Sequence, residues 1–421
     1  MSAPDNLAER RDRYLGAGTT LFYKEPVHIV RGEGVALFDP DGRRYVDMYN
    51  NVPCVGHCHP HVVEAISRQV ATLNVHSRYL HEGVVDYAQR LTEKHHDGIE
   101  NAILMCTGTE AGEVALMMAR AATGGRGIIC SDAAYHGNSS EVRKLTRTSS
   151  VEGDVRSIPF PDTYRYDGAG DACEFYLAKL EEVIAGFKRD GIPLAGMLVC
   201  SIFANEGLPD VPSGFMPRAA QMVRDAGGLF ICDEVQAGLC RTGQWWGYQD
   251  MDIEPDIVTM GKPIGAGVPL SAVAASRELV ESFRRETHYF NTFASSPLQA
   301  AAGNAVLDVI ENESVRENVN QVGGWLLGRL RDVQQRCEPM GDVRGLGLFI
   351  GMDWVTDRQS KTPDVEGAER MVEALKAKGF LISNAGAHNN VLKVRPPLVF
   401  SQADGEAFLD AFDATLDELY A

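Results

Sequence analysis

The chain has 421 residues and a formal net charge of −18, from 58 acidic and 40 basic side chains. Such a surface repels the phosphates of nucleic acids, and no long run of Lys or Arg opposes this. No apolar stretch approaches the roughly 20 residues that a membrane span requires. The first residues alternate in charge and lack the apolar segment of a secretory signal. We therefore expect a cytoplasmic protein that binds neither nucleic acid nor membrane.

The composition is that of an ordinary folded protein, with 44% apolar and 23% charged residues, and the length predicts two domains. The first predicted element is a β-hairpin over residues 35–48, because two short apolar runs flank an Asp-Pro-Asp-Gly turn at residues 39–42. A helix is expected to begin at Pro60, since apolar side chains then recur at helical spacing as far as Val70.

The loop before this helix and the first turn of the helix contain five side chains that could bind a metal, namely Cys54, His57, Cys58, His59 and His61. Structural zinc sites usually have a second pair of ligands further along the chain, and no compact second pair is present. Proline, glycine and asparagine residues around these positions are typical of a turn-rich loop, so we predict a loop without metal. The nine cysteines, an odd number in a chain of this size, are expected to be reduced thiols.

From about residue 100 to residue 300, short apolar runs alternate with helical patterns. The predicted strands cover residues 103–106, 127–130, 197–200, 229–232, 257–260 and 271–275. Because most of these runs are continuously apolar, they indicate strands that helices cover on both faces, as in a mostly parallel sheet. The pattern therefore favours an α/β domain.

Beyond residue 297 the sequence predicts mainly helices. The predicted helices cover residues 298–310, 319–336, 366–378 and 403–419. The predicted strands cover residues 343–352, interrupted by glycines, and residues 391–394. We predict an α/β fold with a large domain at residues 61–310, and a smaller α+β domain built from residues 1–60 and 311–421.

Lys262 has the most unusual position among the ten lysines. It directly follows the apolar run at residues 257–260 and enters a loop rich in glycine, whereas most other lysines lie in polar helical surroundings. A lysine at a strand end in a roomy loop can lose its proton and attack a carbonyl carbon. Lys262 is therefore the candidate for covalent amine chemistry, and a surface turn lysine is the alternative.

Asp233 and Glu234 close another apolar run, residues 229–232. Carboxylates at the carboxyl end of a buried strand are costly unless they are paired, and ligands of open α/β sheets bind at that end. Asp233 could keep a pyridinium nitrogen protonated, which would make the ring of a bound cofactor an electron sink. A salt bridge or a helix cap is the alternative.

Residues 107–110, Thr-Gly-Thr-Glu, join a predicted strand to a strong helix. A glycine flanked by hydroxyls at a helix start can bind an anion, because free N–H groups and the helix dipole point there, although a plain N-cap has a similar sequence. Tyr135 follows the predicted strand at residues 127–130 and could stack on a flat cofactor. No G-x-G-x-x-G fingerprint follows a strand and no P-loop sequence is present, so dinucleotide and nucleoside triphosphate sites lack their motifs.

In their order along the chain, these motifs resemble class III aminotransferases, a branch of the fold type I enzymes that use pyridoxal 5′-phosphate (PLP). The similar segments cover nearly the whole chain and are residues 42–47, 56–60, 107–111, 134–137, 233–238, 241–243, 261–262, 292–293 and 396–398. Residues 50–52 and 395–400 are most similar to the branch that includes alanine–glyoxylate aminotransferase 2-like proteins and phospho-lyases acting on ethanolamine phosphate or phosphohydroxylysine. The chain departs from the common pattern with threonines at positions 107 and 109 and with Ala-Ser-Ser at residues 294–296.

The resemblance implies that PLP is the cofactor and that Lys262 holds it as a Schiff base. The other residues implied to contact the cofactor are Gly108 and Thr109 at the phosphate, Tyr135, His136 and Val235 at the ring, Gln236 at the ring hydroxyl and Asp233 at the ring nitrogen. Thr292 would reach the phosphate of a neighbouring subunit. This makes a homodimer, or a dimer of dimers, the expected assembly.

We expect a transaminase that works by two half-reactions, in which Lys262 moves a proton and a keto acid finally receives the amino group. Arg395 is the candidate for binding a substrate carboxylate, because a guanidinium makes bidentate contacts, and a solvated strand-end arginine is the alternative. A phospho-lyase or ammonia-lyase that works by β-elimination would use the same cofactor residues and is the second hypothesis. A protein that binds PLP without turnover is the third, and the presence of Lys262 and Asp233 argues against it.

Overall fold

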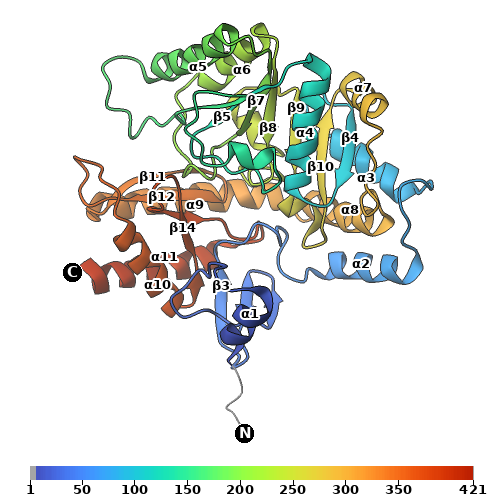
Figure 1. Ribbon diagram of the computed structural model, residues 1–421. Helices are drawn as coiled ribbons and strands as arrows, with labels where there is room; N and C mark the ends of the chain where they lie inside the picture. The colour runs from blue at the N-terminus through green and yellow to red at the C-terminus, as the bar shows by residue number, and fades with distance from the viewer. Residues whose placement is uncertain (1–5, 421) are drawn as a thin grey trace.

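The computed structural model describes residues 6–420, and its centre is a seven-stranded sheet (Figure 1). The strands are β4 (Asn101–Met105), β5 (Gly127–Ser131), β6 (Val155–Ile158), β7 (Leu194–Cys200), β8 (Leu229–Asp233), β9 (Ile257–Met260) and β10 (Ser271–Ala275). Their order is β4-β10-β9-β8-β7-β5-β6, and every neighbouring pair is parallel except the two that involve β10. The six strands predicted for this region are present, with β6 as an additional edge strand. The mostly parallel α/β fold is therefore confirmed.

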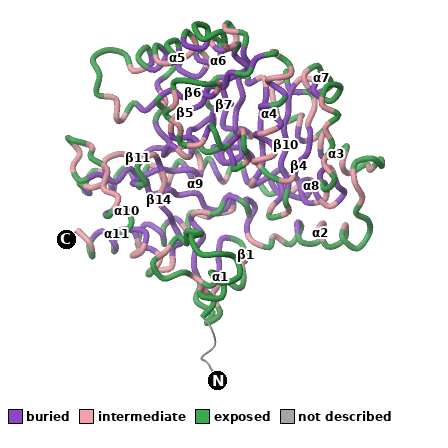
Figure 2. The backbone as a smooth tube through the Cα atoms, in the orientation of Figure 1, coloured by how far each residue is buried: buried purple, intermediate pink, exposed green. Residues whose placement is uncertain are grey.

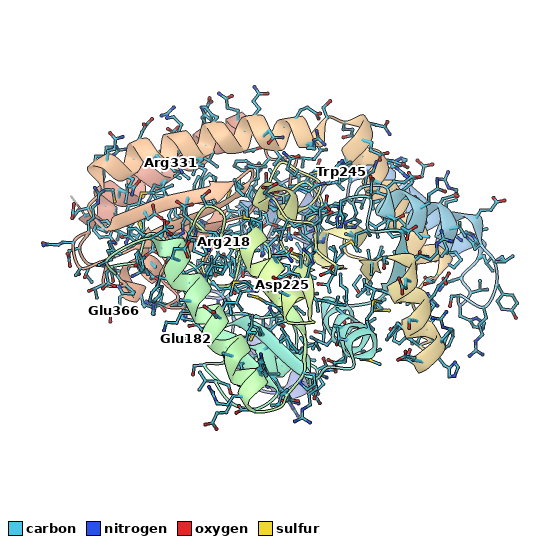
Figure 3. The ribbon with its side chains drawn as sticks, turned by 90° about the horizontal axis from the view of Figure 1, so that it is seen from above. Glu182, Arg218, Asp225, Trp245, Arg331 and Glu366 are labelled. Atoms are coloured by element: carbon cyan, nitrogen blue, oxygen red, sulfur yellow. The ribbon has the colours of Figure 1, made fainter. Side chains whose placement is uncertain are left out.

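Helices cover both faces of this sheet. They are α4 (Gly108–Thr123), α5 (Ala172–Arg189), α6 (Phe215–Asp225) and α7 (Arg277–Thr287). Ile231 of β8 belongs to the core that contains α4, whereas Phe230 and Cys232 belong to the core that contains α5 and α6, as the two-residue period of a strand requires. Figure 2 shows the buried backbone concentrated in the sheet. Figure 3 shows α5, which carries Glu182, running beside α6, which carries Arg218 and Asp225.

Two four-stranded sheets join distant parts of the chain. One contains β1 (Arg31–Glu33), β2 (Ala36–Phe38), β3 (Arg44–Asp47) and β13 (Phe380–Leu381), and the other contains β11 (Met340–Leu346), β12 (Phe349–Trp354), β15 (Val391–Val394) and β14 (Ser383–Ala385). The predicted N-terminal hairpin is confirmed as the antiparallel pair β2–β3, and β3 pairs in parallel with β13. The single strand predicted at residues 343–352 is instead the hairpin β11–β12, because Gly347 adopts a φ of +54° in the turn. The proposed domain boundaries remain a prediction.

The remaining helices are α1 (Leu7–Leu15), α2 (Pro60–Thr72), α3 (Glu82–Thr92), α8 (Pro297–Asn312), α9 (Val315–Arg336), α10 (Val365–Ala377) and α11 (Gln402–Tyr420). Helix α2 begins at Pro60 as predicted, and α8 packs against α2 and α3. Within residues 6–420, no helix is long and apolar enough to cross a membrane. Part of the N-terminal stretch considered for a secretory signal, residues 1–5, lies outside the described residues.

The histidines and cysteines of the loop before α2 have separate surroundings. His59 lies 3.3 Å from a carboxylate oxygen of Glu313, and His61 lies 2.9 Å from one of Asp308. Cys54 is buried, and its thiol lies 3.0 Å from the carbonyl oxygen of Pro263. Among the described residues, no group of three or more His, Cys, Asp or Glu side chains is arranged to hold a metal.

Candidate active site at the carboxyl edge of the large sheet

The carboxyl ends of five parallel strands meet at one edge of the large sheet. The loops that leave these strands surround a cavity of about 110 Å³, lined by Gly108, Thr109, Tyr135, His136, Gly137, Cys200, Asn205, Asp233, Val235, Gln236 and Lys262. Ligands of open α/β sheets bind at this edge, since the loops that follow the strands provide the contacts. The structure thus brings together eight of the predicted site residues, and it places Arg395 and Thr292 outside the cavity lining.

Lys262 begins the short 3₁₀ helix η3 (Lys262–Gly265) directly after β9. Its φ of +28° is unusual for a residue with a side chain, so the backbone is strained at this position, as in many functional sites. Burial lowers the pKa of Lys262, and the nearby Arg395 guanidinium lowers it further, while Asp233 acts in the opposite direction. More of this amine is therefore unprotonated at neutral pH than in an exposed lysine, and the unprotonated form attacks a carbonyl.

Asp233 and Glu234 turn to different sides of the strand end. The Asp233 carboxylate contacts the cavity, where His136 Nδ1 lies 2.6 Å from Oδ2 and the backbone N–H of Val235 donates to Oδ1 at 2.9 Å. The Glu234 carboxylate instead accepts the backbone N–H groups of residues 247–248 at 2.8 and 2.9 Å. Burial raises the pKa of Glu234 to about 7. Of the two carboxylates at this strand end, Asp233 is therefore the one available to a ligand.

The start of α4 leaves backbone N–H groups free to bind an anion. Thr107 caps the helix by accepting the N–H of Glu110 at 3.1 Å, and the Glu110 carboxylate accepts the N–H of Thr107 at 2.9 Å. The N–H groups of Gly108 and Thr109 belong to the first turn, where a helix has no internal acceptor and carries the positive end of its dipole. A Cβ on Gly108 would lie 3.2 Å from the Val235 side chain, so a larger residue would narrow the cavity. This corner can therefore hold a phosphate.

Asn205 connects three walls of the cavity and was missed in the sequence. Its side-chain N–H donates to the carbonyl oxygen of Tyr135 at 3.0 Å, and its Oδ1 accepts an N–H from Gln236 at 2.9 Å. Gln236 Oε1 in turn accepts a hydrogen bond from Arg395. Because Asn205 lies on the loop after β7, the reasoning that identified Asp233, a polar residue following a buried strand, could have found it.

Two buried cations on β15 and at its end lie close to Lys262. Arg395 donates to the carbonyl oxygen of Tyr49 at 2.9 Å and to Gln236, which are both neutral acceptors. Lys393, two residues earlier and so on the same side of the strand, forms no hydrogen bond or ion pair with any residue in the described range 6–420. Burial lowers the pKa of both groups, and Arg395 lowers that of Lys393 further. A buried cation without an anion is costly, so this pair is suited to bind one.

Lys393 was also missed in the sequence, although a lysine that interrupts the apolar run at residues 391–394 is a usable signal. Thr292, in contrast, was predicted and lies outside the cavity of its own chain. It is exposed in the loop between α7 and α8, where the neighbouring Asn291 donates to Glu110 Oε1 at 3.1 Å. The role of Thr292 across a subunit boundary remains a prediction.

Comparisons with known proteins agree on one family. The aminotransferase class-III family matches residues 22–416. The chain is 36% identical to alanine–glyoxylate aminotransferase 2 homolog 2, mitochondrial, of Arabidopsis thaliana, covering 99% of this chain and 88% of the relative. It is 34% identical to ethanolamine-phosphate phospho-lyase homolog 1 of Caenorhabditis elegans, covering 98% of this chain and 93% of the relative.

A solved structure shows the same relationship in the fold. A phospholyase from Arthrobacter in complex with phosphoethanolamine matches with a TM-score of 0.95 and 40% identity, covering 98% of this chain and 100% of that chain. The resemblance inferred from the motifs, including the branch of alanine–glyoxylate aminotransferase 2-like proteins and phospho-lyases, is thereby confirmed. The chain belongs to the class-III aminotransferase family, and its cofactor is pyridoxal 5′-phosphate.

Proposed function

We propose that PLP binds in the cavity at the sheet edge, with its phosphate at the start of α4 and its ring between Tyr135 and Val235. The His136–Asp233 pair supports this fit, because it holds a carboxylate where the ring nitrogen needs a partner. The first turn of α4 offers N–H groups to the phosphate, and Gly108 keeps the space open. When bound, PLP draws electrons from the substrate carbon that carries the amino group, so that a proton or a neighbouring leaving group can depart.

Lys262 is the residue that would hold the cofactor and then move the proton. Once a substrate amine displaces it, its Nζ remains in the cavity beside the substrate carbon and can act as general base. The lowered pKa of Lys262 supports this role, because a base must be unprotonated when the substrate arrives. Asn205, Gln236 and Tyr135 form the hydrogen-bonded wall that orients the ring.

Lys393 and Arg395 would bind an anionic group of the substrate, and they are the observation that carries the choice of reaction. Two buried cations that form no ion pair within residues 6–420 fit a doubly charged phosphate better than a singly charged carboxylate. With a carboxylate, the second cation would remain uncompensated in a buried place. The Arthrobacter phospholyase, 40% identical and in complex with phosphoethanolamine, supports the same choice.

The site therefore favours a phospho-lyase that acts on a phosphorylated amino alcohol. Lys262 removes the proton from the carbon that carries the amino group, and the phosphate leaves from the adjacent carbon with the electrons of its C–O bond. Addition of water then releases an aldehyde and ammonia. Lys393 and Arg395 would hold the phosphate before it departs and stabilise its charge as the bond breaks.

Transamination is the second candidate, and the name of the Arabidopsis relative favours it. In that case Arg395 would bind the carboxylate of an amino acid, as expected from the sequence. Lys262 would return the proton to the cofactor side, and a keto acid would take up the amino group in a second half-reaction. Both reactions begin with the same proton transfer, so the substrate decides between them.

An incubation without any keto acid separates the two candidates. Purified holoenzyme is mixed with phosphoethanolamine and, separately, with L-alanine, and inorganic phosphate, ammonia and pyridoxamine phosphate are measured. A phospho-lyase should release phosphate and ammonia in equal amounts over many turnovers of phosphoethanolamine. A transaminase should stop after one turnover per site and leave pyridoxamine phosphate. The absence of phosphate release, together with a single turnover of L-alanine, would overturn the phospho-lyase proposal.

We also infer a homodimer as the working unit. Exposed apolar side chains support an interface between subunits, with Tyr79, Leu80 and Phe293 at exposures of 66%, 101% and 77%. Large apolar side chains that are exposed to solvent and clustered in one region are typical of interaction surfaces. Phe293 directly follows Thr292, the residue predicted to reach the phosphate of the neighbouring subunit.

A further inference from the structure

A buried carboxylate beside the cofactor cavity has no role in the reaction proposed above. Glu206 follows Asn205 on the loop after β7 and is only 3% exposed. Its Oε1 accepts the hydroxyl hydrogen of Ser131, at the end of β5, whereas its Oε2 is buried and has no hydrogen-bond partner among residues 6–420. A buried oxygen without a partner is costly, so a donor is expected to face it.

His136 has a matching atom without a partner. Its Nδ1 lies 2.6 Å from Asp233 Oδ2, while its Nε2 is buried and bonds to nothing in the described part of the chain. Glu206 and His136 also interact electrostatically. Burial raises the pKa of Glu206 by more than the hydrogen bond from Ser131 and a positively charged His136 together would lower it. Because β5 and β7 are neighbours in the sheet, both side chains come from adjacent strand ends.

We propose that Glu206 is protonated and donates its Oε2 hydrogen to His136 Nε2, either after a small side-chain rotation or through one water. The hydrogen bonds then run in one direction, from the Ser131 hydroxyl to Glu206, from Glu206 to His136, and from His136 Nδ1–H to Asp233. A single proton between Glu206 and His136 satisfies both of the buried atoms. Because the bond at one ring nitrogen of a histidine selects the tautomer, Glu206 holds His136 neutral, with Nδ1–H directed at Asp233.

Glu206 is thus a positioning residue that acts on the cofactor only through His136 and Asp233. A neutral His136 leaves Asp233 with its full negative charge, which the ring nitrogen needs in order to stay protonated. A cationic His136 would compete with that nitrogen for the same carboxylate. The inference rests on the proposed cofactor site, and it does not depend on whether the reaction is elimination or transamination.

Other titratable groups also face Glu206. They are Asp132, the thiols of Cys130 and Cys200, and Lys393. Asp132 raises the pKa of Glu206, and Lys393 is a cation in its protonated form, so the two act on the Glu206 proton in opposite directions. Burial raises the pKa of both thiols, so they remain uncharged and compete little for the proton.

Rescue by a conservative variant tests the inference. Glu206→Gln keeps an N–H donor for His136, whereas Glu206→Leu keeps none. In apo-protein labelled with ¹⁵N-histidine, the His136 signals are assigned by their loss in His136→Gln. We expect a protonated Nδ1 and an unprotonated Nε2 at neutral pH in the wild type and in Glu206→Gln. In Glu206→Leu we expect a doubly protonated or mixed ring.

The bound cofactor provides a second measurement. The pH at which its visible absorbance changes should move by about one unit in Glu206→Leu and return towards the wild-type value in Glu206→Gln. The matched control is Glu234→Gln, which alters another buried carboxylate at the same strand ends and should leave the His136 signals unchanged. If Glu206→Leu does not fold, Ser131→Ala removes the bond that orients Glu206 and should give a partial version of the same change.

Two outcomes would overturn the inference. One is a doubly protonated His136 in the wild type, and the other is identical His136 signals in the wild type and in folded Glu206→Leu or Ser131→Ala. These spectra need neither substrate nor turnover. If phosphoethanolamine is not a substrate, the phospho-lyase proposal fails while the His136 result still decides on Glu206.

Discussion

Two charged corners lie near Lys262, one in the lining of the cofactor cavity and one behind that lining, and their charges are balanced in different ways. At the end of β8, Asp233 already has His136 and the N–H of Val235 as partners. At β15, Arg395 has neutral partners, and Lys393 has no hydrogen-bonding partner in the described chain. The first corner already has partners within the protein, whereas we propose that a bound anion completes the second. Changes at the first should therefore affect the chemical step, and changes at the second should affect substrate binding.

The largest effect is expected at Lys262, which lies between the two corners. Lys262→Ala removes the attachment point and the base together, so turnover should fall by about 10³-fold or more, and the absorbance of the lysine-bound cofactor should disappear. Borohydride reduction and peptide mapping of the wild type should place the cofactor on Lys262. Lys188→Ala, at an exposed lysine of α5, is the control and should leave both measurements unchanged. Label on any other lysine would remove Lys262 from its role.

Asp233→Asn removes the negative charge of the first corner and keeps a side chain of nearly the same size. An amide cannot hold the ring nitrogen as a cation, and the loss of one charge-assisted interaction should cost at least about 2 kcal/mol, or roughly 30-fold in kcat. The KM for the amine should change much less, because the substrate anion binds at the other corner. Asp225→Asn, on the exposed end of α6, is the control. Unchanged turnover in Asp233→Asn would exclude this residue from the cofactor site.

Lys393→Met and Arg395→Met break the second corner. Each removes one charged contact, so the KM for phosphoethanolamine should rise about 10-fold or more, and inhibition by inorganic phosphate should weaken in parallel. Single-turnover kinetics separates this binding effect from the proton transfer. If the two variants lower kcat and leave KM and phosphate inhibition unchanged, the anion site lies elsewhere.

The same Lys393→Met variant should stabilise the protein without ligand. Folding lowers the pKa of Lys393, so protonation disfavours the folded state. The cost is fully present below the folded pKa, and it disappears as the pH rises through the pKa of the unfolded chain. Urea unfolding should therefore find a larger gain for Lys393→Met at pH 6 than at pH 10. A loss of stability at pH 6 would mean that Lys393 is already paired without a substrate.

Glu234→Gln tests the other carboxylate at the end of β8, because Glu234 is adjacent to Asp233 and faces away from the cavity. Its pKa rises from 4.5 to about 7 on folding, so the folded state resists ionisation. The wild type should lose up to about 3 kcal/mol of stability from this group as the pH rises from 4.5 to 7, and the glutamine variant should not. The measurement is the difference between urea unfolding curves of the two proteins across this range. Parallel curves would show that Glu234 is ionised in the folded protein.

The smallest effect is expected at Thr292, outside both corners. If its hydroxyl reaches the phosphate of the neighbouring subunit, cofactor binding and dimerisation are linked, because a ligand that contacts both chains favours the dimer. Adding PLP should then strengthen association of the apo-protein in sedimentation over a dilution series, and Thr292→Ala should weaken this linkage by a few-fold. Thr287→Ala, at the end of α7, is the control. A fully active monomer would refute the shared site.

Much of the fold was readable from local patterns. Continuous apolar runs identified six of the seven strands of the large sheet, and helical spacing identified α2, α8, α9, α10 and α11. The edge strand β6 was missed because its sequence, Val-Arg-Ser-Ile, is short and half polar. The β11–β12 hairpin was taken as one strand, since a glycine inside an apolar run does not reveal that the chain reverses.

The sequence by itself determined where Lys262 and Asp233 lie, because hydrophobic periodicity and a polar residue at a strand end are local signals. Only the tertiary structure decided which of Asp233 and Glu234 faces the cavity, and that Lys393 lies near Lys262 without an ion pair in the described chain. It also decided that Glu206 lies near His136. The reason is that burial and hydrogen-bond partners arise from the packing of distant segments, and a strand pattern contains no information about which distant residue completes a buried charge.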